Sequence, residues 1–232
     1  MRIWLIVYMG CMLFLFGCAL EMQERMNDGG KEIGAMNEQL LQAAANQDTA
    51  KVKQLIKEGA TLDIQDGEGR TALMIATYNN DLTTARALVD AGADVNIQDK
   101  IKNSPFLYAG AQGYLDILKL TIDAGADPSI TNRFGGIALI PAAEHGYVEV
   151  VKELLTNTDS DVNHINNLGW TALLEAIILN DGGEKQQETI QLLIKHGADV
   201  NISDNDGVSP LKHARERGFK EIEQLLLEAG AN

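Results

Sequence analysis

The feature that most constrains this chain is a pair of short sequence patterns that return about every 33 residues. The first is Gly-Ala, continued by Asp-Val-Asn in its fullest copies, and it starts at Gly59, Gly92, Gly125, Gly197 and Gly230, while Asp161-Val162-Asn163 fills the gap. The second is a marker with Ala five residues after its start, and its copies begin at Thr71, Ser104, Ile137, Thr171 and Ser209. A fixed period of this length predicts a stack of small repeated units instead of one globular core.

The two patterns resemble the T-P-L-H-x-A and G-A-D-V-N signatures of the ankyrin repeat, and the resemblance covers residues 37–232. It implies an all-α solenoid of helix-turn-helix pairs with short β-hairpins. Thr or Ser suits the cap of each first helix, and Gly suits the end of each second helix. We expect about six repeats, of which the first (37–65) and the last (204–232) are caps that shield the ends of the array.

Two repeats depart from the pattern. The repeat over 132–165 lacks the Gly that ends its second helix, and we expect Asn157 to adopt the left-handed conformation there. In the same repeat, Pro141 removes one backbone donor from the first helix. The repeat over 166–203 carries five extra residues around 180–185, which we expect to lengthen the loop between its helices. This insertion is either part of a binding edge or a tolerated surface loop.

The N-terminal residues have a different character. Arg2 is followed by 18 residues without a charged side chain, as in the apolar part of a signal peptide. The run Leu15-Phe16-Gly17-Cys18-Ala19 resembles the lipobox of bacterial lipoproteins. This resemblance implies a signal peptide at 1–17, lipidation of Cys18, and a flexible polar tether that completes the segment 18–36. The alternative is an uncleaved helix that spans the membrane.

Charge and cysteine content limit the possible functions. The chain has 33 Asp and Glu against 19 Lys and Arg, which gives a net charge of −14. We expect no nucleic-acid partner, because nucleic-acid binding requires a basic face. A basic protein partner would complement the acidic chain. The two Cys residues, Cys11 and Cys18, both precede the repeats, so the repeat domain has no thiol for a disulfide or a zinc site.

The sequence contains no recognisable catalytic pattern. Its four histidines, at 145, 164, 196 and 213, fall at different positions within their repeats, and no nucleophile stands beside a candidate base. We therefore predict that the protein is not an enzyme and needs no cofactor or metal. A cryptic hydrolase is kept as an alternative, because fold alone does not decide function.

The resemblance also locates a candidate binding surface. In ankyrin repeat proteins the hairpin tips and the exposed side of the first helices line a concave groove that binds proteins. The corresponding candidates here are Tyr78, Ile101, Asn103, Arg133, Phe134, His145, Leu168, Trp170 and Ile178. Five of these are apolar where solvent-facing positions are usually polar, which favours a binding site with Trp170 as a hot spot. The alternative is that they pack hairpin against hairpin and stabilise the array.

The predicted function is that of a membrane-anchored protein–protein interaction module, a scaffold or adaptor, that acts as a monomer. An immunity or inhibitor lipoprotein that neutralises a toxin or an envelope enzyme is a more specific alternative. The lipid anchor would hold the repeats outside the cytoplasm, in the cell envelope. Ala19 after Cys18 suits sorting to the outer membrane of a Gram-negative cell, and in a Gram-positive cell the protein would lie on the outer face of the plasma membrane.

Overall fold

The structure is a computed structural model, and it describes residues 32–232. The predicted signal peptide, Cys18 and the tether up to residue 31 lie outside the described residues. A helix over residues 32–45 comes first. The helices that follow are α2 (Thr49–Lys57), α3 (Ala72–Tyr78), α4 (Leu82–Asp90), α5 (Pro105–Gln112), α6 (Leu115–Asp123), α7 (Leu139–Glu144), α8 (Val148–Asn157), α9 (Ala172–Ile178), α10 (Glu184–Lys195), α11 (Pro210–Arg217) and α12 (Lys220–Glu228).

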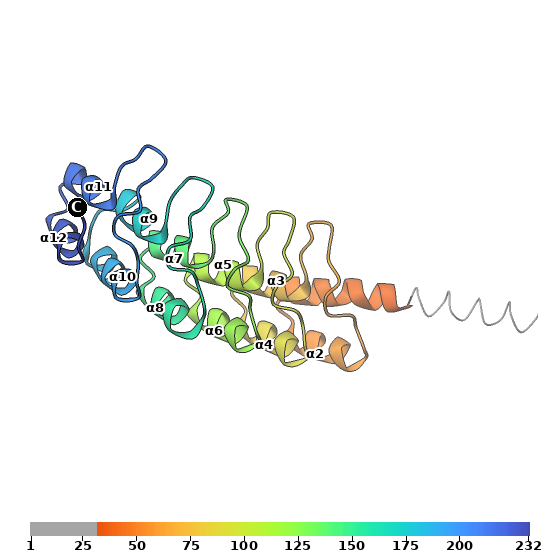
Figure 1. The fold of residues 1–232 in the computed structure, drawn as a ribbon. Coiled ribbons are helices and arrows are strands. Elements are labelled where there is room, and N and C mark those ends of the chain that lie inside the picture. The colour runs from red at the N-terminus through yellow and green to blue at the C-terminus, as the bar shows by residue number, and fades with distance from the viewer. Residues whose placement is uncertain (1–31) are drawn as a thin grey trace, which may run out of the picture.

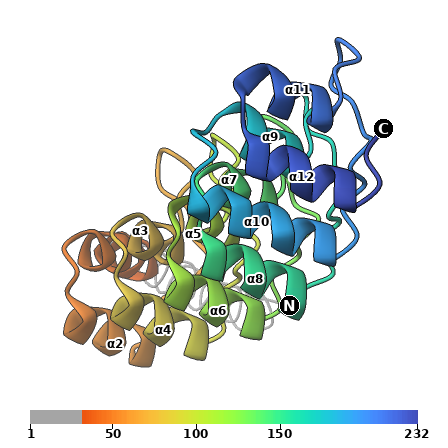
Figure 2. The same ribbon diagram turned by 90° about the vertical axis from the view of Figure 1, so that its left-hand side faces the viewer.

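The helices form two parallel rows, and a loop projects from the same side of each repeat (Figure 1). The inner row contains α3, α5, α7, α9 and α11, and the outer row contains the even-numbered helices, which Figure 2 shows stacked one above another. The predicted all-α solenoid is therefore confirmed. The projecting loops turn back like hairpins, but no residue in the described range is in a β-strand. In the first loop two backbone bonds, from Asp66 N to Arg70 O and from Gly69 N to Asp66 O, close the tip, which is too little for a strand ladder.

The inner helices begin where the sequence markers predict. The side chains of Thr71, Ser104, Thr171 and Ser209 each accept a hydrogen bond from the backbone N–H three residues later. Ile137 has no such acceptor, and α7 starts only at Leu139 and has 6 residues. Pro141 is consequently the third residue of this helix, where no intrahelical partner exists for an N–H, so its missing donor costs little.

The end of α8 differs from the expectation. Gly59, Gly92, Gly125, Gly197 and Gly230 follow the other outer helices with φ between 84 and 96°. Asn157, however, is not among the residues with positive φ, so the predicted left-handed conformation is wrong. The chain leaves α8 in extended form at Thr158, whose hydroxyl donates to the Leu154 carbonyl at 2.6 Å. This bond satisfies a helix-end carbonyl by a side chain instead of by a backbone N–H.

The insertion around 180–185 lengthens a helix as well as the loop. Helix α10 has 12 residues, whereas α8 has 10 and α12 has 9. Asn180 joins the insertion to its surroundings, because its amide donates to the Glu144 carbonyl and its Oδ1 accepts from Gln186. The extra residues are therefore built into the array and are not a free surface loop.

The ordered array begins earlier than residue 37. The predicted tether extends to residue 36, but residues 32–36 already belong to the first helix. Met36 packs against the core, and Asn37 Oδ1 accepts a hydrogen bond from Thr61 N at 2.8 Å. The boundary therefore lies at or before residue 32.

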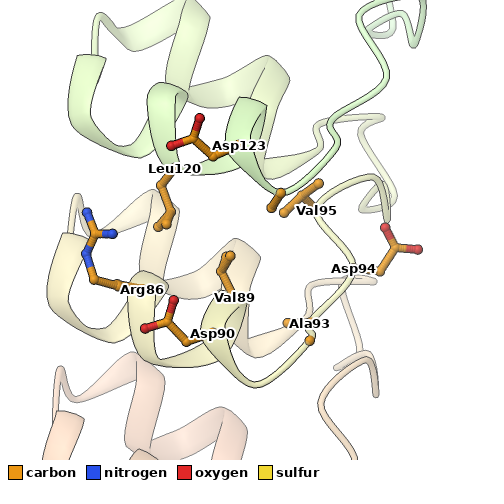
Figure 3. A pocket seen from close by; sticks show the side chains of 10 residues that line it. Arg86, Val89, Asp90, Ala93, Asp94, Val95, Leu120 and Asp123 are labelled. Carbon is orange, nitrogen blue, oxygen red and sulfur yellow. The ribbon is translucent and has the colours of Figure 1, made fainter.

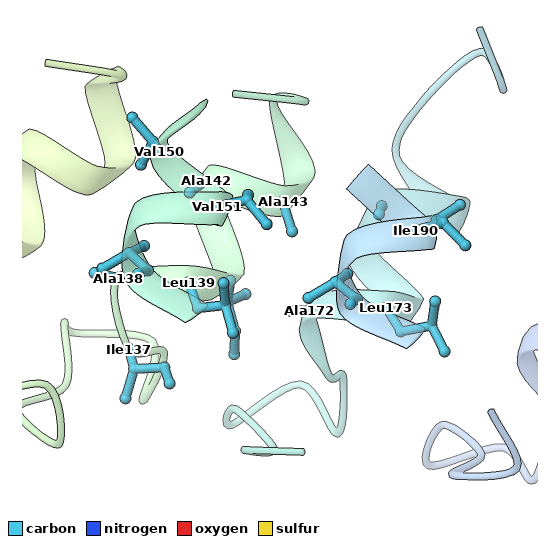
Figure 4. Packing of buried hydrophobic residues seen from close by; sticks show 14 of the residues in the cluster. Ile137, Ala138, Leu139, Ala142, Ala143, Val150, Val151, Ala172, Leu173 and Ile190 are labelled. Atoms are coloured by element: carbon cyan, nitrogen blue, oxygen red, sulfur yellow. The ribbon is translucent and has the colours of Figure 1, made fainter. Parts of the chain in front are cut away.

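The core runs along the whole stack as a series of similar layers. Leu139 and Val151 of one repeat lie beside Leu173 and Ile190 of the next, and all four are fully or almost fully buried (Figure 4). The inner helices approach one another closely because small residues face the neighbours. A Cβ added to Gly110 would lie 2.9 Å from the Cβ of Ala138. Such close contact fixes the spacing of the loops that form the candidate site.

Candidate functional site: a cleft on the inner face

A cleft of about 620 Å³ lies between the inner helices and the loops of the central repeats. Helices α3, α5, α7 and α9 provide its wall, and the loops around 101, 134 and 168 provide its rim. The residues that line it are Tyr78, Ile101, Asn103, Tyr108, Ala111, Gln112, Asn132, Arg133, Phe134, Gly136, Ile140, Pro141, Glu144, His145, Asn166, Leu168, Trp170, Glu175 and Leu179.

The structure brings together eight of the nine residues that the sequence proposed for this surface. Ile178 is the exception, because it is half-buried at the end of α9 and does not line the cleft. The next residue, Leu179, lines it instead and is 47% exposed. The alignment of the repeats still holds, because Tyr78 occupies the position equivalent to Ile178 and does line the cleft. That these residues bind a partner stays a prediction.

The end of the cleft nearest α3 has a rigid aromatic wall. The Tyr78 hydroxyl donates to Asp99 Oδ2 at 2.5 Å and accepts from Asn103 Nδ2 at 3.0 Å. Burial, together with the hydrogen bond to Asp99, raises the pKa of Tyr78 to about 12. The Tyr78 ring meets that of Tyr108 edge-on, with centroids 4.4 Å apart. These contacts hold Tyr78 and Asn103 in place without a ligand.

The rim carries exposed apolar side chains on neighbouring loops. Ile101 is 47% exposed, Phe134 is 52% exposed and Leu168 is 51% exposed. Neighbouring loops are joined by backbone bonds, such as that from Asn167 N to Phe134 O at 2.9 Å, and by polar side chains, such as Asn205 Nδ2 on Leu168 O. The side chains of Phe134 and Leu168 remain about half exposed, which argues against hairpin packing as their purpose. Trp170 differs from them, because it is half-buried between the rim and the floor.

The floor contains a carboxyl group that the sequence analysis missed. Glu175 on α9 is only 6% exposed, and its Oε1 accepts from Asn166 Nδ2 at 2.7 Å. Burial and then the nearby charge of Glu144 raise the pKa of Glu175 to about 7, although the bond from Asn166 opposes this. A charged residue is rarely buried in this way without a reason. The sequence did contain a signal for this residue, because Glu175 is the one carboxyl group at its position in the repeats. The equivalent residues of the other repeats are Ile75, Tyr108, Pro141 and His213.

The four histidines have separate environments. His164 Nε2 lies 2.7 Å from the Gly135 carbonyl, His196 Nδ1 lies 2.8 Å from that of Leu192, and His213 pairs with Asp204. Only His145 lines the cleft, with its ring against that of Tyr147. Within residues 32–232, no three His, Cys, Asp or Glu side chains are grouped so that they could hold a metal ion.

A second hollow, of about 590 Å³, lies on the outer side between α4 and α6 (Figure 3). Arg86, Asp90, Asp94 and Asp123 lie around it. A similar hollow of about 460 Å³ lies between α10 and α12. Both follow from the spacing of neighbouring outer helices, so neither one marks a particular repeat.

Comparison with known proteins identifies the family of these repeats. A family model described as ankyrin repeats in three copies matches residues 10–99, 40–132, 106–204 and 139–232. The chain belongs to the ankyrin repeat family. It is 60% identical over 80 residues to a protein named ankyrin repeat protein YahD from Escherichia coli K12, a match that covers 34% of this chain and 40% of that protein. The chain therefore spans less than half the length of this relative.

Solved ankyrin repeat structures resemble most of the array. An ankyrin repeat domain from Acinetobacter baumannii AYE is 54% identical, with a TM-score of 0.81 over 83% of this chain and 98% of that one. The ankyrin repeat domain of Bcl-3 is 26% identical, with a TM-score of 0.74 over 84% of this chain and 86% of that one. Ankyrin repeats suggest a protein–protein interaction module, and the fold is generally a non-catalytic scaffold. Within residues 32–232, none of the helices combines the length and apolar character needed to cross a bilayer.

Proposed function

We propose that this protein is a membrane-anchored scaffold or adaptor that binds a protein partner in the inner cleft. The observation that carries the proposal is the group of exposed apolar side chains, Ile101, Phe134 and Leu168, on three successive loops around one cleft. Apolar groups placed together on a surface commonly mark a protein interface. Trp170 is half-buried beside them, and Trp is among the residue types that contribute most to the binding free energy of protein interfaces.

The rigidity of the cleft supports this role. Tyr78 and Asn103 are already fixed by hydrogen bonds, and backbone contacts join the loops. A partner would therefore meet a surface whose side chains lose little conformational freedom on binding. The acidic charge of −14 favours a basic partner, and it also supports the more specific alternative of an inhibitor for a basic toxin or envelope enzyme.

Anchoring is proposed from the lipobox-like junction at Cys18. A diacylglyceryl group on this thiol would hold the array at the cell envelope, outside the cytoplasm, because several acyl chains give stable attachment. Cys18→Ala is expected to leave an uncleaved precursor without lipid, measured by mass spectrometry and radiolabelled palmitate. Normal processing and labelling of this variant would contradict the anchor.

The binding role is tested with a matched pair of substitutions. Leu168→Ala removes an exposed side chain in the cleft, and Leu227→Ala removes one, 40% exposed, on α12 outside it. We capture partners from envelope extracts with the full-length protein in nonionic detergent and measure the affinity of each purified partner. Leu168→Ala, Phe134→Ala and Trp170→Ala should weaken binding at least 10-fold, as hot-spot truncations do. Leu227→Ala should leave the affinity unchanged.

The stability of the same variants separates binding from packing. Because Phe134 and Leu168 are about half exposed, their truncation should change the free energy of unfolding by about 0.5 kcal/mol or less. If Trp170→Ala lowered stability by about 3 kcal/mol and left affinity intact, Trp170 would be a packing residue. One stoichiometric basic partner, instead of several, would favour the inhibitor over the scaffold.

A further inference from the structure

We propose that the cleft receives one cationic side chain of the partner, an arginine or a lysine, between the carboxyl groups of Glu175 and Glu144. This inference rests on the proposed function and adds to it the chemistry of the ligand. It is argued from the open carboxyl oxygen at the floor of the cleft, from the lack of a counter-ion within residues 32–232 and from the aromatic walls of the cleft.

The floor of the cleft presents a carboxyl oxygen that the described chain leaves open. Glu175 is 6% exposed, and within residues 32–232 the hydrogen bond of its side chain is the one that Oε1 accepts from Asn166. Oε2 accepts none there, and it is not sealed from solvent, because the buried atoms without a partner are Asp81 Oδ2 and Thr189 Oγ1. A carboxylate removed from water is stabilised only when donors replace the lost solvent. A donor from a ligand in the cleft can therefore take the place of solvent at Oε2.

Within residues 32–232, no Lys, Arg or His side chain forms an ion pair with Glu144 or Glu175. The ion pairs of residues 32–232 join Arg70 to Asp66, Lys119 to Glu153, Lys212 to Glu216, Arg215 to Glu223 and His213 to Asp204, and none includes Glu144 or Glu175. Arg133, the one Arg or Lys that lines the cleft, lies over the Phe134 ring at 4.7 Å. Glu144 and Glu175 line the same cleft, the charge of Glu144 contributes to the raised pKa of Glu175, and neither one has a counter-ion within residues 32–232.

The walls suit the stem and the charge of a long cationic side chain. Trp170, Phe134 and Tyr108 line the same cleft as the two carboxyl groups. Arginine and lysine pack their methylene groups on apolar surface and place their charge against aromatic faces or carboxylates. Arginine can also donate two hydrogen bonds to one carboxylate or bridge two. A neutral donor would satisfy the free oxygen but would leave the repulsion between Glu144 and Glu175.

A random peptide library displayed on phage provides the probe. It is selected at pH 8 on the full-length protein in nonionic detergent, and clones whose binding depends on Trp170 and Leu168 are kept. We expect these clones to share an Arg or Lys. Replacing that Arg by citrulline, its neutral analogue, should weaken binding at least 10-fold, and Glu175→Gln should cause a similar loss. The two changes together should cost little more than either alone, which identifies the direct pair.

Two controls define the effect. Glu153→Gln removes a carboxylate that pairs with Lys119 outside the cleft, and it should leave the affinity unchanged. The pH series uses a His145→Gln background, because histidines also change charge near neutral pH. This part of the cleft has other titratable groups, namely Glu144 and His145 on α7, Tyr108 on α5, and Arg133. In the next repeat, Asp204 and His213 pair with each other. Affinity for the Arg peptide should rise between pH 6 and 8 and become flat in Glu175→Gln.

The possible results separate the two proposals. Clones that need Trp170 and Leu168 but carry no cation, or that tolerate Glu175→Gln, overturn the cationic ligand and leave the binding cleft standing. A selection that yields no clone, or only clones insensitive to every cleft substitution, overturns the cleft as a binding site as well. Circular dichroism and thermal unfolding of Glu175→Gln confirm that a lost affinity does not come from a lost fold.

Discussion

The loops of two successive repeats are closed by the same backbone hydrogen bonds but contact their inner helices in opposite roles, one as a donor and the other as an acceptor. Asn166 opens one loop and Asp204 opens the next, and the Oδ1 of each accepts the backbone N–H groups two and four residues later. The second side-chain atom of each reaches the inner helix. Asn166 Nδ2 donates to Glu175 at 2.7 Å, whereas Asp204 Oδ2 accepts from His213 Nε2 at 2.7 Å.

The difference shows that the repeat fixes where the loop side chain meets the inner helix, but not which of the two side chains is the hydrogen-bond donor. In these two repeats the loop has Asn where the inner helix carries Glu175 and Asp where it carries His213. Asp99 contacts a different helix, because its Oδ2 accepts from the Tyr78 hydroxyl of α3 in the preceding repeat. In the last repeat burial alone would raise the pKa of Asp204, but hydrogen bonds from the amides of Val208 and Asp206 and from His213 hold it below its usual range. In the repeat before it, the pKa of Glu175 is raised.

Asn166→Asp should break this pairing most strongly. Its Oδ1 can still close the loop, but Oδ2 would face the Glu175 carboxylate at the position of a donor. We expect a loss of about 3 kcal/mol in the free energy of unfolding at pH 8, as for an uncompensated buried charge. The loss should be smaller at pH 5, where one proton can be shared. Urea unfolding at both pH values measures it.

The double variant Asn166→Asp with Glu175→Gln is the decisive control for that prediction. It restores a donor and an acceptor in reversed order and should recover most of the lost stability. If the double variant stays as unstable as Asn166→Asp alone, the exchange of polarity does not explain the choice of residues.

Glu175→Gln alone should stabilise the protein at high pH. The folded protein keeps a proton on Glu175 up to about pH 7, whereas an unfolded Glu loses it near 4.5. The free energy of unfolding of the wild type therefore falls as the pH rises from about 4.5 to 7 and stays low above that range. The variant should gain about 2 kcal/mol over the wild type at pH 8 and nearly nothing at pH 4.5. Equal effects at both pH values would contradict the raised pKa, and Glu153→Gln is the control.

Asp204→Asn should have the smallest effect of the three. The amide can still close the loop through Oδ1, and only the charged bond to His213 is lost. We expect about 1 kcal/mol of destabilisation, the amount that one hydrogen bond typically contributes. A loss as large as that of Asn166→Asp, measured by the same urea unfolding, would mean that the two loops do not differ in the way described.

The sequence by itself determined the elements that depend on short-range pattern. The period of the markers gave the array and the order of its helices, and Thr71, Ser104, Thr171 and Ser209 marked the starts of four inner helices. It also placed eight of nine candidate residues on one cleft. The predictions of the array and its helix starts succeeded because capping and apolar periodicity act within one repeat and recur in each, whereas the binding role of the cleft residues stays a prediction.

Only the tertiary structure decided what depends on the neighbouring repeats. Helix formation over residues 32–36, where no apolar period is visible, accompanies the packing of Met36 on the core. Leu179 replaces Ile178 in the cleft. Glu175 lies on α9, which packs against the neighbouring helix α7 with Glu144, and its pKa responds to the charge of Glu144. Burial and pKa depend on contacts between segments that the sequence of one repeat does not contain, so the chemistry of the cleft emerged only when the repeats were stacked.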